Sequence, residues 1–432
     1  MRRIYVHFLK LGDIMKDYLN KFRALLYTPI LIYVFLLIGV SLIAIYSSMP
    51  LALFQYPDSG NFVIRQLLFF GVGAVALICI LFFGMEKIRL LRWWIYGFFM
   101  LLLLLLFADR LIPGISFSWV QEINGATRWI DLGLLSLQPS EFMRIALILV
   151  IADVIQKHND RYPAPLKTSG ADFKLILKTL ALIALPAALI FFQPDSGITI
   201  LILVTTAVML LAAGIKWRYI ITVAAIAFVV ISIFITTVTQ YPDFLINTLG
   251  IEAYQISRFN GWFDPFASIS GDGRQLAHGL IGMGTGGLFG HGIRSGVVFF
   301  PEAHTDFIFS VIGKDFGLIG AMAVVTLYAL FNFEILNTAA LNRNHYNGSV
   351  CAGIFASLMA QQFWNIGMTI GILPISGVTL PFISHGGSSV LASMILLGLI
   401  LSSYVEGAKI KRFEANYQEH VLYLKTKAYL KE

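Results

Sequence analysis

Ten long apolar runs, spread over the whole chain, decide what kind of fold this sequence can adopt. A helix that crosses the hydrocarbon core of a bilayer needs about 20 predominantly apolar residues, and no strand-like alternation competes with these runs. Of the 432 residues, 58% are hydrophobic and 13% are charged, whereas about a quarter of a soluble domain is charged. The sequence therefore predicts an all-α polytopic membrane protein with about ten transmembrane helices. The predicted spans are Ile30–Ile45, Leu67–Phe83, Trp93–Phe107, Pro139–Ile155, Phe173–Phe191, Gly197–Ala213, Tyr219–Thr236, Phe307–Leu330, Val350–Ile372 and Ser388–Tyr404.

The positions of Lys and Arg between the spans predict the orientation, because basic residues resist translocation. With the N-terminus inside, 23 Lys and Arg residues lie in or within a few residues of the connections on that face, whereas the opposite face has five besides Arg65, which precedes the second span. Both termini are therefore predicted to be cytoplasmic. The net charge of +7 follows from this topology and from attraction to anionic lipid, and it indicates no nucleic-acid partner.

The membrane domain is predicted to be a single unit with two long external loops. Residues 1–27 form a cytoplasmic juxtamembrane segment, residues 28–405 the ten-helix domain, and residues 406–432 a basic cytoplasmic tail. The external loops, residues 108–138 and 238–306, are too long for simple turns and too rich in aromatic and apolar residues for disorder. We expect both loops to pack over the bundle or dip into it from outside, where irregular backbone must line protein or a wet cavity.

Ionisable residues in or beside the spans are functional candidates, because a charge at the centre of a bilayer is costly. Glu141 and Arg144 lie three residues apart, on one helix face, as a possible ion pair. The other candidates are Arg65, Asp195, His304, Asp306, Lys314 and Asp315. All of them fall on the outer half of the bundle, which predicts a polar cavity that opens outward. The alternative is that Glu141–Arg144 and Lys314–Asp315 are structural pairs that hold helices together.

Two glycine-containing segments and one histidine are further candidates. The run from Gly279 to Gly292 contains a formal GxGxxG, but no βαβ context supports a dinucleotide site; we expect a tight or re-entrant turn with N–H groups available to an anion. The segment Leu380–Val390 either lines the site or caps the last span. His304 is either hydrogen-bonded scaffolding or a group that transfers a proton.

Five blocks in order resemble one known family. They are "NGATRWIDLGLLSLQPSEFMRIALIL", "QPDSG", "GTGGLFGHG", "PEAHTDFIFSVIGKDFGLIG" and "LPISGVTLPFISHGGSS". Together they resemble the SEDS family (shape, elongation, division and sporulation) of bacterial cell-wall proteins, which includes RodA, FtsW and SpoVE. The block "LQPSEFMRIALIL" is more similar to the RodA branch, whereas "PEAHTDFIF" is common in the FtsW branch too.

The resemblance implies a peptidoglycan glycosyltransferase in the bacterial cytoplasmic membrane. Such proteins polymerise lipid II onto an undecaprenyl-linked glycan at the outer face and release undecaprenyl pyrophosphate. Their partners are a class B penicillin-binding protein, which crosslinks the product, and other elongation or division proteins. Two alternatives stay open: a lipid II flippase that uses the same outward cavity, and a catalytically weak scaffold for the penicillin-binding protein.

The resemblance also implies substrate-binding residues. By position in the blocks these are Arg128, Trp129, Glu141, Arg144, Asp195, His304, Asp306, Ser384 and Ser388. One departure concerns catalysis, because the family's catalytic Asp falls on Ser268 in this chain. Asp264 lies four residues before Ser268 and Asp272 four after it, and either could take over as the base that accepts a proton from the acceptor hydroxyl.

The departing pyrophosphate needs positive charge beside it. Arg65, Arg144, Arg258 or Arg274 could supply this charge, since guanidinium suits bidentate phosphate contact. A divalent cation, Mg²⁺ or Mn²⁺, could accompany the pyrophosphate. The sequence identifies no ligands for such an ion.

Overall fold

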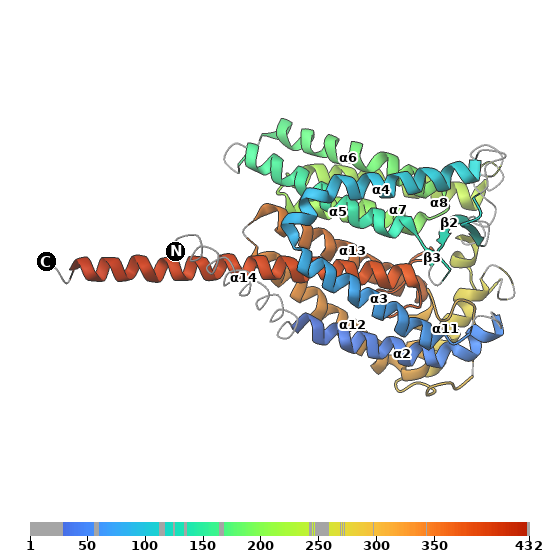
Figure 1. Cartoon of the computed structure of the whole chain (residues 1–432). Coiled ribbons are helices and arrows are strands. Elements are labelled where there is room, and N and C mark those ends of the chain that lie inside the picture. Colours follow the sequence, from blue (N-terminus) through green and yellow to red (C-terminus); the bar gives the residue numbers. More distant parts are fainter. Residues whose placement is uncertain are drawn as a thin grey trace.

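Ten long helices correspond one to one with the ten predicted spans. A computed structural model of the chain describes residues 29–55, 60–111, 117–123, 126–133, 136–163, 168–241, 244, 246, 259–267, 269, 271, 273–296, 298–342 and 344–429. Within these residues the long helices are α2 (Pro29–Gln55), α3 (Phe62–Phe83), α4 (Met85–Leu111), α5 (Pro139–Arg161), α6 (Ser169–Phe192), α7 (Ser196–Ala212), α8 (Trp217–Gln240), α12 (Ile308–Leu341), α13 (His345–Thr369) and α14 (Gly387–Tyr429). They lie side by side as one bundle (Figure 1).

The length and composition of the helices fit a membrane-spanning bundle. Six of those described are long and apolar enough to cross a membrane, namely α2, α3, α4, α6, α12 and α14, and α7 is a shorter apolar helix of the same kind. The prediction of an all-α polytopic membrane protein is confirmed. The start of α2 and the end of α14 lie at one end of the bundle, as an even number of crossings requires (Figure 1).

Helix α5 is the centre of the bundle. It contacts α4, α6, α7 and α13, and every residue from 139 to 153 is buried. A helix that is buried on all sides must pair its charges within the protein. At one end of α5, Asp153 does so with Arg92 at 2.8 Å and Lys157 at 2.9 Å. At the other end the charged residues are Glu141 and Arg144.

The first external loop contains a small antiparallel sheet, which the sequence did not predict. Its strands are β1 (Val120–Ile123), β2 (Ala126–Asp131) and β3 (Ser136–Leu137), in the order β1-β2-β3. Val120 pairs with Ile130, and Ile130 pairs with Leu137. The sheet lies at the end of the bundle where α14 begins, so it covers that end as expected (Figure 1).

The glycine-rich run is part of helix α11 (Arg274–Gly286) and the turn after it. This turn packs against a break in α12 at Gly317, which has φ 64° and ψ −160°. The N–H groups of His291 and Gly292 donate to the carbonyl oxygens of Lys314 and Asp315, at 2.9 and 3.0 Å. The expectation that N–H groups of this run are available to an anion is therefore wrong for these two, because they bind the carbonyl oxygens that the break in α12 exposes.

Lys314 and Asp315 form a buried ion pair beside this turn. Their side chains are 1% and 0% exposed, and Nζ lies 3.1 Å from Oδ1. The aliphatic stem of Lys314 lies under Gly282 of α11, where an added Cβ would come within 3.7 Å of it. The interpretation as a structural pair is the one that this packing supports.

Replacing Gly290 with alanine is expected to destabilise the protein by about 1–3 kcal/mol, the usual effect of overpacking. Gly290 has φ 80°, and a Cβ there would lie 2.2 Å from the carbonyl oxygen of Asp315. The control is Gly284→Ala, because a Cβ at Gly284 meets nothing within 4 Å and alanine favours a helix interior. The midpoint of thermal unfolding checks both variants; an equal shift in the two would contradict the close packing described here.

Candidate functional site

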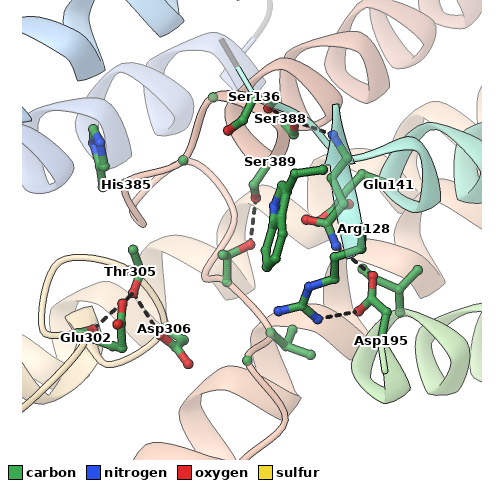
Figure 2. A pocket seen from close by; sticks show the side chains of 18 of the residues that line it. Arg128, Ser136, Glu141, Asp195, Glu302, Thr305, Asp306, His385, Ser388 and Ser389 are labelled. Carbon is green, nitrogen blue, oxygen red and sulfur yellow. Dashed lines mark hydrogen bonds and ion pairs between the residues drawn. The ribbon is translucent and has the colours of Figure 1, made fainter. Parts of the chain in front are cut away.

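A cavity of about 260 Å³ lies at the end of the bundle that the sheet covers. Its walls come from β2 and β3, the starts of α5 and α7, helix α11, and the segments that precede α12 and α14. Figure 2 shows side chains from these distant segments facing one another across it. Six residues predicted from the sequence line this cavity, which are Arg128, Trp129, Glu141, Asp195, Asp306 and Ser388.

Asp195 is held by three neighbours on one wall. Gln138 Nε2 donates to its Oδ2 at 2.6 Å and Ser140 Oγ donates to the same oxygen at 2.7 Å. Arg128 NH1 lies 3.5 Å from Oδ1, and the Arg128 guanidinium also covers the ring of Trp129 at 4.2 Å. Charge-assisted hydrogen bonds of this kind fix the carboxylate in one orientation.

A chain of hydrogen bonds runs from Glu141 to the opposite wall. Arg144 NH2 donates to Glu141 Oε2 at 2.7 Å, which confirms the predicted ion pair, and Arg144 NH1 donates to Gln361 Oε1 of α13 at 2.8 Å. Gln361 Nε2 donates to the carbonyl oxygen of Thr379 at 3.0 Å. The Thr379 hydroxyl is 2.6 Å from that of Ser389. The Arg144 guanidinium therefore binds Glu141 and Gln361 within the wall, and Arg144 does not line the cavity.

Two further carboxylates gather around one hydroxyl. Thr305 Oγ1 lies 2.8 Å from Asp306 Oδ1 and 2.9 Å from Glu302 Oε2, as Figure 2 shows. A hydroxyl has one hydrogen, so Thr305 donates to one of these carboxylates at a time. Both carboxylates line the cavity, and both are acceptors for hydrogen bonds from a ligand.

Ser384 and Ser388 join separate segments of the wall. Ser384 Oγ donates to the carbonyl oxygen of Thr305 at 2.6 Å and accepts from the N–H of Leu380 at 2.7 Å. Ser388 Oγ donates to the carbonyl oxygen of Ser136 at 2.6 Å and accepts from the N–H of Gln138 at 2.8 Å. These two predicted residues therefore position the loop rather than offer a free hydroxyl.

His304 and His385 pack against α3, and His385 also lines the cavity. The Phe62 ring lies 4.6 Å from that of His304 and 5.1 Å from that of His385, and His385 Nδ1 is 3.1 Å from Gln66 Oε1. In Figure 2 the His385 ring lies apart from the other labelled side chains. Burial lowers the pKa of both imidazoles, that of His385 to about 3, with the nearby His304 and Arg65 acting in the same direction on His385. This environment favours scaffolding over proton transfer for His304.

Acidification is expected to weaken the fold through His385. The pKa of His385 is about 3 in the folded protein and about 6.5 in the unfolded chain. Between these two pH values the unfolded chain binds a proton that the folded protein does not, so stability is lost as the pH falls from about 6.5 towards about 3. At about pH 5 the loss is about 1–2 kcal/mol. Thermal unfolding midpoints at about pH 7.5 and 5 check it. His385→Gln should lessen the difference and His291→Gln, at an exposed site, should not; an undiminished difference in His385→Gln would refute the assignment.

The remaining predicted residues lie outside the cavity lining. Arg65 is exposed on α3. Asp264 is exposed too, and its Oδ1 accepts the N–H of Ala267 at 3.1 Å. Its neighbour Pro265 packs against Gly273, two residues before the cavity-lining Gln275. Arg258, Ser268 and Asp272 lie outside the described residues.

Gln138, Gln275, Glu302 and Thr379 are among the lining residues that the sequence analysis did not single out. Gln138 and Glu302 stand inside the quoted motif blocks, so adjacency to predicted residues was a usable signal. Thr379 stands inside the last of these blocks, whereas Gln275, a neutral polar residue at a helix start, has no such signal. Among the described residues, no group of three or more His, Cys, Asp or Glu is placed to hold a metal ion.

A family model and individual relatives assign the chain to the same family. A family model described as "Cell cycle protein", which covers FtsW, RodA and SpoVE, matches residues 28–407. A protein of Nitrosomonas europaea named probable peptidoglycan glycosyltransferase FtsW is 33% identical over 382 residues, 85% of this chain and 90% of that protein. A protein of Neisseria gonorrhoeae with the same name is 32% identical over 408 residues, 86% of this chain and 83% of that protein.

Solved structures share the fold. A chain in a structure described as "Structural coordination of polymerization and crosslinking by a peptidoglycan synthase complex" aligns with TM-score 0.67 at 23% identity, over 88% of this chain and 97% of that one. The rod shape determining protein RodA of Thermus thermophilus aligns with TM-score 0.59 at 22% identity, over 87% of this chain and 95% of that one. The relatives from Nitrosomonas europaea and Neisseria gonorrhoeae both carry the name FtsW, so assignment to the RodA branch stays a prediction. With its apolar helical bundle, the chain is a multi-pass membrane protein and belongs to the FtsW/RodA/SpoVE family of cell cycle proteins, the SEDS family.

Proposed function

We propose that this protein is a peptidoglycan glycosyltransferase that polymerises lipid II at the outer face of the bacterial cytoplasmic membrane, in cell division or in elongation. The observation that carries the proposal is the cavity at the sheet-covered end of the bundle, where Glu141, Asp195, Glu302 and Asp306 meet Trp129. The names of relatives at 30% identity or more support the same activity.

The proposed reaction is one displacement at an anomeric carbon. A sugar hydroxyl of one lipid-linked saccharide attacks the anomeric carbon of the other; the new glycosidic C–O bond forms as the bond to the diphosphate breaks, with inversion. The hydroxyl proton passes to a carboxylate, an effect of about 10²–10⁴-fold. We assign this role to Asp264, whose neighbour Pro265 packs against Gly273 near the cavity-lining Gln275, or to Asp272. Undecaprenyl pyrophosphate leaves with the bonding electrons.

The apolar outside of the bundle accommodates the polyprenyl chains. Exposed large side chains cover α3, α4 and α6, for example Leu68, Phe98 and Phe173, and a lipid tail lies against such surfaces at no desolvation cost. A substrate anchored in this way needs a site only for its head group. This matches a small cavity at one end of the bundle.

The proposal includes the partner and the ion expected from the sequence. A class B penicillin-binding protein is the proposed partner, which a structure of a peptidoglycan synthase complex with the same fold supports. A divalent cation would be held mainly by the diphosphate, since the described residues form no metal cluster of their own. Chelation with EDTA tests this: polymerisation should stop and return when Mg²⁺ or Mn²⁺ is added.

Purified protein with labelled lipid II tests the activity. A ladder of glycan strands on a gel, absent when Asp264 and Asp272 are both replaced, is the expected result. Transfer of labelled lipid II between leaflets of a vesicle without any ladder would favour the transporter. If the protein neither transfers lipid II nor forms a ladder, but raises the activity of an added penicillin-binding protein, the scaffold would be favoured.

A further inference from the structure

We infer that the cavity is a subsite for one sugar ring of the substrate, and that the diphosphate binds outside it. This inference rests on the proposed function, because it concerns how the head group of lipid II divides between the cavity and its rim. The arguments come from the size, the charge and the hydrogen-bonding groups of the cavity.

The size allows a single ring. The cavity volume is about 260 Å³, below the range of about 300–1,000 Å³ that holds drug-sized ligands. A disaccharide with its peptide is larger than such ligands. One ring with its substituents is therefore the part of the head group that can enter, and the rest stays at the rim.

The charge of the walls excludes a diphosphate. Four carboxylates line the cavity, and Arg128 is the one Lys or Arg among the described lining residues. Arg128 already lies 3.5 Å from Asp195, and Arg144 binds Glu141 and Gln361 within the wall. Like charges repel strongly in a site of low dielectric constant, so a doubly charged group is disfavoured here. The prediction that Arg144 contacts pyrophosphate does not fit this arrangement.

The hydrogen-bonding groups match a sugar. The carboxylates of Glu302 and Asp306 accept from hydroxyl groups. In the described part of the chain, Gln275 Nε2 and Arg128 Nε are buried without a hydrogen-bond partner, and buried donors of this kind call for a ligand or a water molecule. A sugar supplies acceptors through its hydroxyl and acetamido oxygens. The half-buried indole of Trp129 adds an apolar surface for the C–H face of the ring.

The rim supplies a place for the diphosphate. Arg274 opens α11 and is exposed, next to the lining residue Gln275. A phosphate attached to a ring inside the cavity therefore meets a guanidinium as it leaves the opening, and guanidinium is well suited to phosphate oxygens. The cavity then holds neutral groups and the rim holds the charged one.

Protection of an introduced cysteine tests the assignment without measuring activity. Ser136→Cys places a thiol on the cavity wall, in a chain whose own Cys79 and Cys351 are replaced by serine. The rate at which a small methanethiosulfonate reagent labels this thiol is measured without a ligand, with lipid-free N-acetylglucosaminyl-N-acetylmuramic acid, and with inorganic pyrophosphate. Leu132→Cys, exposed next to the same sheet but outside the cavity, is the matched control.

The disaccharide is expected to slow labelling of Ser136→Cys about tenfold at about ten times its Kd, and pyrophosphate is expected to leave the rate unchanged. Gln275→Leu should weaken protection by the disaccharide without changing the unprotected rate. Protection by pyrophosphate, or by neither compound up to the limit of solubility, would overturn the assignment. If the subsite assignment fails but the same preparation forms a glycan ladder from lipid II, the proposed function still holds.

Discussion

Replacing Arg144 with methionine lowers the free energy of unfolding by about 3–5 kcal/mol, the expected effect of removing one partner of a buried ion pair. Arg144 and Glu141 are 1% and 4% exposed and lie 2.7 Å apart, so the variant leaves a carboxylate buried without its cation. Gln361 loses the donor to its Oε1 as well. The midpoint of thermal unfolding of the purified protein measures the loss.

The double variant Glu141→Gln/Arg144→Met is the control. It removes both charges together, and replacing a whole buried pair is often close to neutral. We therefore expect the double variant to be more stable than Arg144→Met alone. If the two variants unfold at the same temperature, Glu141 does not depend on Arg144 and the hydrogen-bond chain from α5 to α13 is not important for stability.

The second large effect concerns catalysis. Replacing Asp264 and Asp272 together with asparagine is expected to reduce the rate of lipid II polymerisation by about 10²–10⁴-fold, the usual contribution of a general base. Stability should change little through Asp264, because its side chain is exposed. The single variants show which of the two carboxylates accepts the proton. Initial rates of glycan formation at saturating lipid II provide the measurement.

Asp131→Asn is the matched control for Asp264. Asp131 lies on the same end of the bundle and also accepts a backbone N–H, that of Gly133 at 2.8 Å, but it does not line the cavity. We expect it to polymerise lipid II at the rate of the parent protein. A double variant at Asp264 and Asp272 that is equally active would move the base to a carboxylate inside the cavity, and Asp306→Asn would then be the variant to measure.

The helices could be predicted because each depends on a local property. Ten apolar runs gave ten helices, since the length of a run alone decides whether it can cross a bilayer. The ion pair of Glu141 with Arg144 followed from their spacing on one helix. Both predictions needed nothing from elsewhere in the chain.

The cavity could be predicted only in part, because its walls come from segments far apart in the sequence. Lys314 and Asp315 are within 11 residues of His304, yet they pack against the turn after α11 and not around the cavity. The glycine-rich run gave the wrong expectation for its N–H groups because their acceptors are carbonyl oxygens of α12. Gln361 and Thr379, which connect Arg144 to Ser389, carry no charge, and Gln361 lies outside every motif block.

The hydrogen-bond chain from Glu141 to Ser389 limits which substitutions the protein can accept during evolution. Glu141, Arg144, Gln361, Thr379 and Ser389 belong to four segments, but each fixes the next through a hydrogen bond. Residues in one network do not contribute additively, so a substitution tolerated in one lineage can be harmful in another that differs at a second link. We therefore expect epistasis along this chain, with exchanges between relatives succeeding only when the linked residues are transferred together.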